Sequence, residues 1–408
     1  LIQFHYVPRQ KGRPLAMPLA LQCFDRYVAR PGWATEAAQI EAARIARQIG
    51  CDTFWLDAAW FPRGFPEGVG SWFADPKGFP NGLKPVSDEC HRQGLRFVLW
   101  FEPERVAAGS QIAEEHSDFV FGGKQGGLFK LSDPQARRWL TDLLSQRITE
   151  FGIDVYRNDF NIDPLDFWRR NDTPDRQGMT EIRYVEGLYA MWDELLTRHP
   201  GMFIDNCASG GRRIDLETIM RSVPLWRSDT GCSPGHPDWN QVQYAGLGQY
   251  VPIHTVACWS TDAYDCRSAT TAGAIVEWPY LDRDFSMDPA KAAMAEIREN
   301  RKYCYGDFYP LTPAMAGTES FVAHQFHRPD LDAGMVLAFR RTNCNLVGVI
   351  TPIMATKADS TYEVEFIDED RGHTTKTMTG EELAAGLELR IKTTGHSLAV
   401  RYKAIAKK

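Results

Sequence analysis

The stretch SDPQARRWLTDLLSQRITEFGIDVYRNDFNIDP, residues 132–164, contains the two elements whose alternation decides the fold. Residues 132–152 predict a helix that opens with Ser-Asp-Pro, because serine or aspartate caps a helix and proline fits its first turn. The run that follows holds Ile153 and Val155, which suit the interior of a buried strand. That strand then ends in a group of polar residues around Asp159.

The same alternation of apolar strand and amphipathic helix recurs through the first three quarters of the chain. Eight segments are predicted as strands: 18–24, 51–60, 95–104, 152–164, 202–209, 224–230, 254–260 and 272–280. The predicted helices are 35–50, 85–94, 132–152, 179–200, 213–223, 238–250 and 288–306. Near-continuous apolar strands followed by helices imply a parallel sheet covered by helices, and eight such units imply an α/β fold of the (β/α)8 barrel type. A doubly wound open sheet is the alternative, but no GxGxxG follows the first strand.

The pattern changes after about residue 308. Short runs of alternating apolar and polar residues, separated by turn residues, continue to the end of the chain. Such runs predict an antiparallel β-sandwich. We therefore expect a barrel at residues 17–307 and a C-terminal β-sandwich at residues 308–408.

Composition limits the classes of function. The 408 residues carry a formal net charge of −7, which argues against a nucleic-acid partner. No apolar run approaches the roughly 20 residues that span a bilayer, so no membrane segment is predicted. Nine cysteines without a CxxC pair indicate neither a zinc ribbon nor a small disulfide scaffold. Because the chain begins at Leu1, a leader or upstream domain can be missing, and the localisation stays open.

Polar and aromatic residues follow six consecutive strands, and in such barrels the chemistry lies at the carboxyl ends of the strands. These residues are Asp57, Trp60, Glu102, Glu104, Arg157, Asp159, Asn161, Asp205, Asn206, Cys207, Arg227, Ser228, Asp229, Trp259, Ser260 and Asp262. A single aspartate after a strand is often only a helix cap. Six such strand ends in succession predict a polar pocket whose walls include flat aromatic side chains.

The absence of other motifs narrows the chemistry. The sequence has no HxH pair or HExxH and no Walker loop. We therefore expect no metal or other cofactor. Two facing carboxylates become the leading hypothesis, which is the arrangement of a glycosidase. Asp159 and Asp229, on the fourth and sixth predicted strands, are the candidate pair.

At these residues the sequence resembles glycoside hydrolase family 36, the melibiase-like microbial α-galactosidases with their α-N-acetylgalactosaminidase and raffinose-synthase relatives. The resemblance runs in order from about Pro18 to Tyr309. The segments that carry it are FWLDAAWF (54–61), FPNGL (79–83), VLWFEPERV (98–106), LSDPQARRWL (131–140), YRNDFN (156–161), DNCASGGRRIDL (205–216), LWRSDT (225–230) and GDFYPLTP (306–313).

The resemblance implies a retaining, exo-acting α-glycosidase that hydrolyses terminal α-D-galactosides, such as melibiose- or raffinose-type oligosaccharides or galactosylated glycans. In this scheme Asp159 is the nucleophile and Asp229 the acid/base, acting by double displacement. The residues implied to contact the carbohydrate substrate are Asp57, Trp60, Arg157, Asn161, Cys207, Gly210, Arg213 and Arg227.

The chain departs from the family pattern in substrate recognition. The family's paired aspartates are here Asp57 and Ala58, and arginine at position 157 replaces the lysine before the nucleophile. Arg212 stands where a small residue is usual, in a loop that approaches the sugar 2-position, so a 2-acetamido or anionic sugar is conceivable. The alternatives are therefore an α-N-acetylgalactosaminidase or another sugar specificity, an α-galactosyl transglycosylase, or a non-catalytic carbohydrate-binding barrel.

The family normally has a large β-sandwich before the barrel. Residues 1–16 are therefore expected to be a linker or a remnant of a missing N-terminal β domain. Because that domain contributes to oligomer contacts in the family, the oligomeric state is left undecided.

Overall fold

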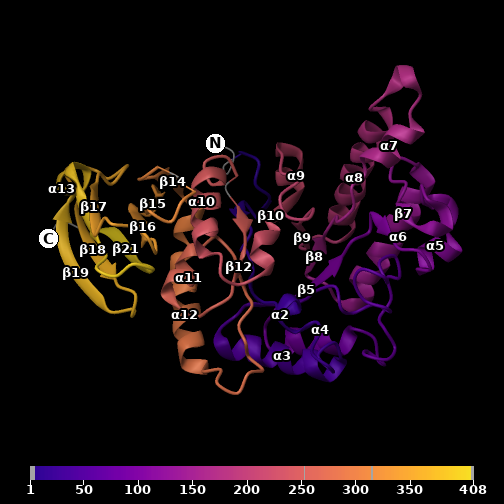
Figure 1. Ribbon diagram of the computed structural model, residues 1–408, viewed down its shortest axis with the longest axis horizontal. Helices are drawn as coiled ribbons and strands as arrows, with labels where there is room; N and C mark the ends of the chain where they lie inside the picture. The colour runs from indigo at the N-terminus through magenta and orange to yellow at the C-terminus, as the bar shows by residue number, and fades with distance from the viewer. Residues whose placement is uncertain (1–4, 252, 314–315, 406–408) are drawn as a thin grey trace. The chain divides into compact units, whose positions relative to one another are not determined.

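The computed structural model describes residues 5–251, 253–313 and 316–405 (Figure 1). The chain divides into two compact units, one comprising Tyr6–Asp229 and the other beginning at Thr230. Each unit is described by itself. In the described part of the chain, no helix combines the length and the apolar character that crossing a membrane requires.

A parallel sheet forms the centre of the first unit. Its strands lie in the order β10, β9, β8, β5, β4, β3. Their bounds are β3 Leu19–Leu21, β4 Thr53–Leu56, β5 Arg96–Phe101, β8 Val155–Asn158, β9 Phe203–Asn206 and β10 Ser222–Trp226. The register places Arg157 between Trp100 on β5 and Asp205 on β9. The last residues of three neighbouring strands therefore meet at one edge of the sheet.

Helices follow the strands as the sequence predicts. Their bounds are α3 Glu36–Ile49, α4 Lys84–Arg92, α6 Pro134–Phe151, α8 Met179–Arg198 and α9 Leu216–Arg221. The Ser-Asp-Pro signal is confirmed, since the Asp133 carboxylate accepts hydrogen bonds from the backbone N–H groups of Gln135 (2.8 Å) and Ala136 (3.4 Å). The helix ends at Gly152, whose φ of 64° lies in the left-handed region that favours glycine.

Several short elements in the loops were not predicted, because they lack a clear hydrophobic period. They are β1 Arg9–Gln10, β2 Arg13–Pro14, α2 Phe24–Tyr27, β6 Arg105–Val106, α5 Gln111–Glu115, β7 Gly127–Leu128 and α7 Leu165–Asn171, with the 3-10 turns η1 Ser117–Phe119, η2 Gly123–Gln125, η3 Pro174–Arg176 and η4 Asp229–Cys232.

The second unit begins with the same alternation of strand and helix. Its elements are α10 Pro237–Leu247, β11 His254–Thr255, β12 Ala257–Cys258, α11 Ala263–Ser268, β13 Ala274–Val276, α12 Met287–Asn300 and η5 Tyr303–Tyr305. β12 and β13 pair in parallel. The single strand predicted at 254–260 is two short strands. Parallel pairing and alternating helices confirm the predicted (β/α)8 barrel class.

An antiparallel β domain follows in the same unit. A six-stranded sheet runs in the order β14, β15, β16, β21, β18, β19, and β17 pairs with β20 beside it. The bounds are β14 Asp307–Pro310, β15 Phe321–Arg328, β16 Ala333–Arg340, β17 Gly348–Thr351, β18 Thr361–Ile367, β19 His373–Thr379, α13 Gly380–Ala385, β20 Leu387–Arg390 and β21 His396–Ile405. Residues of both sheets, including Tyr362, Leu389 and Val400, share one apolar core. The predicted antiparallel sandwich is thus confirmed, while the boundaries 1–16, 17–307 and 308–408 stay a prediction.

A test of helix packing compares two helical glycines. In Gly187→Ala on α8, the new methyl group would lie 2.1 Å from the carbonyl oxygen of Leu131, and this backbone atom cannot rotate away. We expect a loss of about 1–3 kcal/mol in the free energy of unfolding, as for overpacked cores. Gly246→Ala on α10 meets nothing within 4 Å and should stabilise the chain by about 0.5–1 kcal/mol. Urea denaturation of both variants would contradict this account if Gly187→Ala were as stable as Gly246→Ala.

Candidate active site

Asp159 follows the last residue of β8 and is held from several directions. Its backbone N–H donates to the carbonyl of Phe101 (2.8 Å), which extends the strand pairing by one residue. Its carboxylate accepts from the indole N–H of Trp100 (3.1 Å) and from the backbone N–H groups of Phe160 (2.7 Å) and Ser209 (3.4 Å). The side chain is 8% exposed, so a fixed carboxylate retains a small contact with solvent.

Arg157 lies two residues before Asp159, on the same face of the strand. Its guanidinium carbon lies 4.9 Å from the ring centroid of Trp55 and 5.6 Å from that of Trp226. One guanidinium nitrogen forms an ion pair with Asp205 on the neighbouring strand. Burial opposes the charge, yet surrounding thiol and carboxyl groups raise the pKa of Arg157 above its ordinary value. Those groups are Cys207, Asp205, Asp159 and Asp57. Arg157 therefore remains a cation inside the site.

Two further carboxyl groups share this arginine. Asp57 follows β4 and accepts from the indole N–H of Trp55 (2.9 Å) and from the backbone N–H of Ala58 (2.9 Å). Burial raises the pKa of Asp57 to about 6, although Arg157 opposes the rise. Burial also raises the pKa of Asp205 to about 6, again against the effect of Arg157. One cation thus stands among three carboxyl groups.

Asp229 lies three residues beyond the end of β10 and is more exposed than Asp159. The indole N–H of Trp226, the last residue of β10, donates to its carboxylate at 3.0 Å. Trp226 therefore contacts both Asp229 and the guanidinium of Arg157.

The loop between β9 and α9 lies between the two aspartates. A Cβ atom on Gly210 would lie 2.9 Å from the Cα of Ser228 and 3.0 Å from the backbone nitrogen of Asp229. Only glycine permits this approach, and the φ of 82° at Gly210 favours glycine as well. The preceding residue, Ser209, donates its backbone N–H to Asp159. One loop thus contacts the carboxylate of Asp159 and packs against the backbone of Asp229.

The electrostatic environment favours the charged form of Asp159. Burial alone would raise its pKa, but the charge of Arg157 outweighs that effect, with the help of hydrogen bonds from Asn161, Cys207 and the Phe160 N–H. The pKa of Asp159 therefore lies below its ordinary value. At neutral pH this carboxyl group is an anion.

The environment of Asp229 has the opposite effect. Partial burial raises its pKa, and the nearby negative charge of Asp159 raises it further. The hydrogen bond from Trp226 and the charges of Arg157 and Arg212 only reduce the rise. One group of the pair is thus biased toward the anion and the other toward the acid.

Glu102 and Glu104 are fully buried beneath this site. Glu102 pairs with Arg105 (2.7 Å) and accepts from the backbone N–H of Asn161, and burial raises its pKa to about 7. Glu104 pairs with Arg213 at 2.7 Å. Both carboxylates fix the loops that follow β5, β8 and β9.

The structure brings most of the predicted site residues together, but some of them support the β9–α9 loop. Asn161 accepts from the hydroxyl of Ser209 (2.9 Å) and supports Asp159, and Cys207 donates to Asp159 as well. Arg213 donates to the side chain of Asn206 (3.0 Å) and the carbonyl of Cys207 (3.1 Å), so it stabilises the start of the β9–α9 loop. Arg227 is buried directly after β10.

Trp60 lies elsewhere. It is fully buried, and its indole N–H donates to the carbonyl of Trp100 at 2.9 Å. Its ring packs edge-on against Phe61 (5.3 Å between centroids) and Phe101 (5.1 Å). The turn after Asp57 directs it into the core, so it offers no surface to a ligand.

Arg212 also differs from the expectation that its side chain could serve an anionic or 2-substituted sugar. Its guanidinium donates to the carbonyls of Ala208 (2.8 Å), Phe160 (3.1 Å) and Ile162 (3.2 Å), and it pairs with Asp163 (2.7 Å). The contacts with Phe160, Ile162 and Asp163 join the loop after β8 to the loop after β9. The role of Arg212 in the structure is to hold these two loops together.

Sequence reasoning missed Trp55 and Trp100 as parts of the site. Trp55 precedes Asp57 by two residues, just as Trp100 precedes Glu102 and Arg157 precedes Asp159. Residues i and i+2 share one face of a strand. This i, i+2 spacing is the sequence signal that could have identified Trp55 and Trp100 as parts of the site.

A stability test follows from the position of Arg157 among several buried carboxyl groups. Arg157→Met leaves its carboxyl partners buried without a counter-charge, and breaking such a pair costs about 3–5 kcal/mol at neutral pH. The loss should shrink at pH 5, because Asp57 and Asp205, with raised pKa values, take up protons in the folded chain, whereas unfolded carboxyl groups stay ionised.

The matched control is Arg170→Met, since Arg170 pairs with Asp166 at 3.6 Å on the exposed surface. Its effect on the free energy of unfolding should stay within about 1 kcal/mol at both pH values. Denaturation curves at pH 5 and 7 would contradict the account if Arg157→Met cost the same at both.

Comparison with known proteins gives a consistent family and fold. The family model described as Melibiase matches residues 34–244. Alpha-galactosidase 1 of Pediococcus pentosaceus is 26% identical over 322 residues, which cover 73% of this chain and 43% of that protein. Alpha-galactosidase Mel36A of Lactobacillus acidophilus is 30% identical over 250 residues, 54% of this chain and 34% of that protein. The chain spans less than half the length of these relatives.

Solved structures share the fold. An α-galactosidase from Lactobacillus brevis superposes with a TM-score of 0.81 at 20% identity, covering 97% of this chain and 56% of that one. A variant of the α-galactosidase AgaA from Geobacillus stearothermophilus, solved in complex with raffinose, gives a TM-score of 0.82 at 20% identity, covering 97% of this chain and 57% of that one. At this identity the likeness supports the barrel-and-sandwich fold alone.

Proposed function

This chain belongs to the melibiase family, and from that premise we propose that it is a retaining, exo-acting α-glycosidase that hydrolyses terminal α-D-galactosides. The observation that carries the proposal is the opposite bias of two carboxyl groups. The pKa of Asp159 lies below its ordinary value and that of Asp229 above it, and both contact the β9–α9 loop. A retaining glycosidase requires one ionised and one protonated carboxyl group.

The first chemical step uses both groups at once. The carboxylate of Asp159 attacks the anomeric carbon, the bond from that carbon to the leaving oxygen breaks, and Asp229 transfers its proton to that oxygen. The product is a glycosyl ester of Asp159 with inverted configuration. Arg157 holds Asp159 in the ionised form that this attack needs.

The second step reverses the roles. Asp229, now ionised, takes a proton from a water molecule, and the water oxygen replaces Asp159 at the anomeric carbon. A second inversion restores the α configuration and frees Asp159. If a sugar hydroxyl replaced water, the same site would perform transglycosylation, and measuring free galactose against transfer products separates the two outcomes.

The sugar proposed for this site is neutral galactose. Relatives in the family are α-galactosidases, and one structural neighbour was solved with raffinose. We propose that Asp57 accepts hydrogen bonds from hydroxyl groups of the sugar and that Asn161 and Cys207 line the same pocket. A panel of nitrophenyl α-glycosides of galactose, N-acetylgalactosamine and glucose and the β-L-arabinopyranoside tests the choice, with galactose expected to react fastest.

Removal of the nucleophile gives the sharpest test of the mechanism. Asp159→Ala should lower kcat for nitrophenyl α-galactoside by at least about 10³-fold, because no covalent intermediate can form. Added azide should restore part of the rate and give the β-galactosyl azide, identified by NMR. Asp163→Asn, an exposed change four residues along the same segment, should keep nearly full activity. A wild-type rate for Asp159→Ala would exclude this mechanism.

The pH profile tests the acid. Trp226→Phe keeps an aromatic ring beside Arg157 but removes the hydrogen bond that lowers the pKa of Asp229. The pKa of Asp229 should rise, so its proton is lost at higher pH. The alkaline limb of kcat/KM should therefore move to higher pH, while the acid limb, set by Asp159, should stay in place. A shift of the alkaline limb to lower pH would contradict the assignment.

A further inference from the structure

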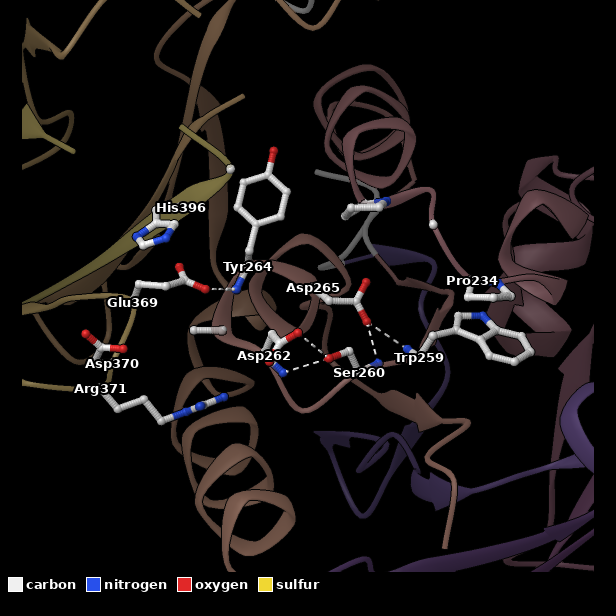
Figure 2. A pocket seen from close by; sticks show the side chains of 14 residues that line it. Pro234, Trp259, Ser260, Asp262, Tyr264, Asp265, Glu369, Asp370, Arg371 and His396 are labelled. Carbon is white, nitrogen blue, oxygen red and sulfur yellow. Dashed lines mark hydrogen bonds between the residues drawn. The ribbon is translucent and has the colours of Figure 1, made fainter. Parts of the chain in front are cut away.

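The strand end at Trp259–Asp262, which the sequence marks as polar and aromatic, has no part in the proposed catalytic pair. In the second unit these residues line a cavity of about 700 Å³ (Figure 2). The opposite side is formed by Glu369–Arg371, in the connection between β18 and β19, and by His396 at the start of β21. The volume lies within the range of about 300–1,000 Å³ that is typical of small-molecule sites.

Buried charges hold the two sides of this cavity in place. Arg267 pairs with Glu296 (2.6 Å) and donates to the carbonyl of Asp368 (2.8 Å). Arg371 pairs with the same Glu296 (2.9 Å) and donates to the carbonyl of Thr261 (2.8 Å). Each arginine thus ties the barrel-type segment to the β18–β19 connection. The cavity is therefore preformed, and a ligand would not have to order its walls.

Two of the lining carboxylates are occupied by backbone groups. Glu369 accepts from the backbone N–H groups of Tyr264 (2.7 Å) and Ser397 (2.7 Å). Asp265 accepts from the backbone N–H groups of Trp259 (2.8 Å) and Ser260 (2.7 Å). These two carboxylates shape the walls of the cavity and have little remaining capacity to accept hydrogen bonds from a ligand.

The remaining polar groups are available to a ligand. The carboxylate of Asp370 has no hydrogen-bond or ion-pair partner among the residues that the structure describes, and its side chain is exposed. Asp262 accepts from the hydroxyl of Ser260 (2.7 Å) through one oxygen. His396 lies beside Glu369 in the view of Figure 2. Carboxylate oxygens accept charge-assisted hydrogen bonds, so the cavity suits a ligand rich in donors.

Aromatic and apolar surface completes the lining. The indole of Trp259 is fixed by a hydrogen bond to the carbonyl of Gly231 (2.8 Å), and Pro234 and Pro237 also line the cavity. Flat apolar rings pack well against ligands that have one apolar face and polar edges.

Charge selects among the ligands that meet these conditions. Four carboxyl groups line the cavity against one arginine, whose guanidinium is already paired, so phosphates and acidic sugars are disfavoured. Within the described residues, no group of three or more His, Cys, Asp or Glu side chains is placed to hold a metal ion. We propose that this cavity binds a neutral saccharide, with hydroxyl groups donating to Asp370 and Asp262 and a ring face packed on Trp259.

The saccharide can come from two sources, either the aglycone end of a substrate chain or a separate sugar. The inference concerns binding without turnover, and only the aglycone source rests on the proposed hydrolysis. The full-length chain carrying Asp159→Asn serves as the background, and calorimetry measures its binding of sucrose and of the neutral tetrasaccharide stachyose. Stachyose carries an α-galactosyl end and sucrose does not.

Adding Asp370→Ala to this background should weaken binding about tenfold, the effect of one hydrogen bond to a charged group. The control, Asp359→Ala, changes another exposed aspartate of the same domain and should leave affinity unchanged. Because Asp370 has no partner among the described residues, its loss should not lower the melting temperature. Trp259→Leu is a second variant, and it should also weaken sugar binding.

Weaker binding of both sugars by Asp370→Ala supports a site for a separate saccharide. Weaker binding of stachyose alone supports a site for the aglycone end of a substrate. If neither sugar binds at millimolar concentration, or if Asp370→Ala and Asp359→Ala bind equally well, the proposal is overturned. A chain that binds sucrose through this cavity but hydrolyses no α-galactoside would refute only the proposed function.

Discussion

The buried guanidinium of Arg157 is the interaction on which the site depends. It lies against two indole rings and pairs with Asp205, and its charge opposes the rise in the pKa of Asp57 and lowers the pKa of Asp159. A charge removed from water is costly unless it is paired, and several buried carboxylates would be costlier still. The arginine and the acids therefore require one another. Because Asp159 receives further hydrogen bonds and the other acids receive fewer, a single cation keeps one carboxyl group ionised while two neighbours have pKa values of about 6.

Much of this arrangement was predictable because it follows from short periods in the sequence. The helix over 134–151 was predicted by its capping aspartate and proline, and the positions of Asp159 and Asp229 near the ends of apolar strands were predicted as well. Apolar alternation could not predict the edge strand β19, because nearly all of its residues are exposed. The position of Trp60 was misjudged for a related reason. It follows a strand but belongs to a turn, where the strand period no longer determines the direction of a side chain.

The electrostatics of the site could not be predicted from the sequence. Whether an aspartate has a raised or lowered pKa depends on which groups from distant segments surround it, and those segments meet only in the folded chain. Arg212 illustrates the point. Its unusual position suggested a contact with substrate, but three hydrogen bonds join its loop to the loop after β8. The sequence showed that a charge was present but did not show which partner would neutralise it.

The glycine contact at position 210 has a consequence for how this site can change over time. Ser209 donates to one acid while Gly210 packs against the backbone that carries the other, so one peptide unit is in contact with both. A side chain at position 210 would have to displace that backbone, so variation at this position is expected to be far more restricted than in the exposed loops around the site.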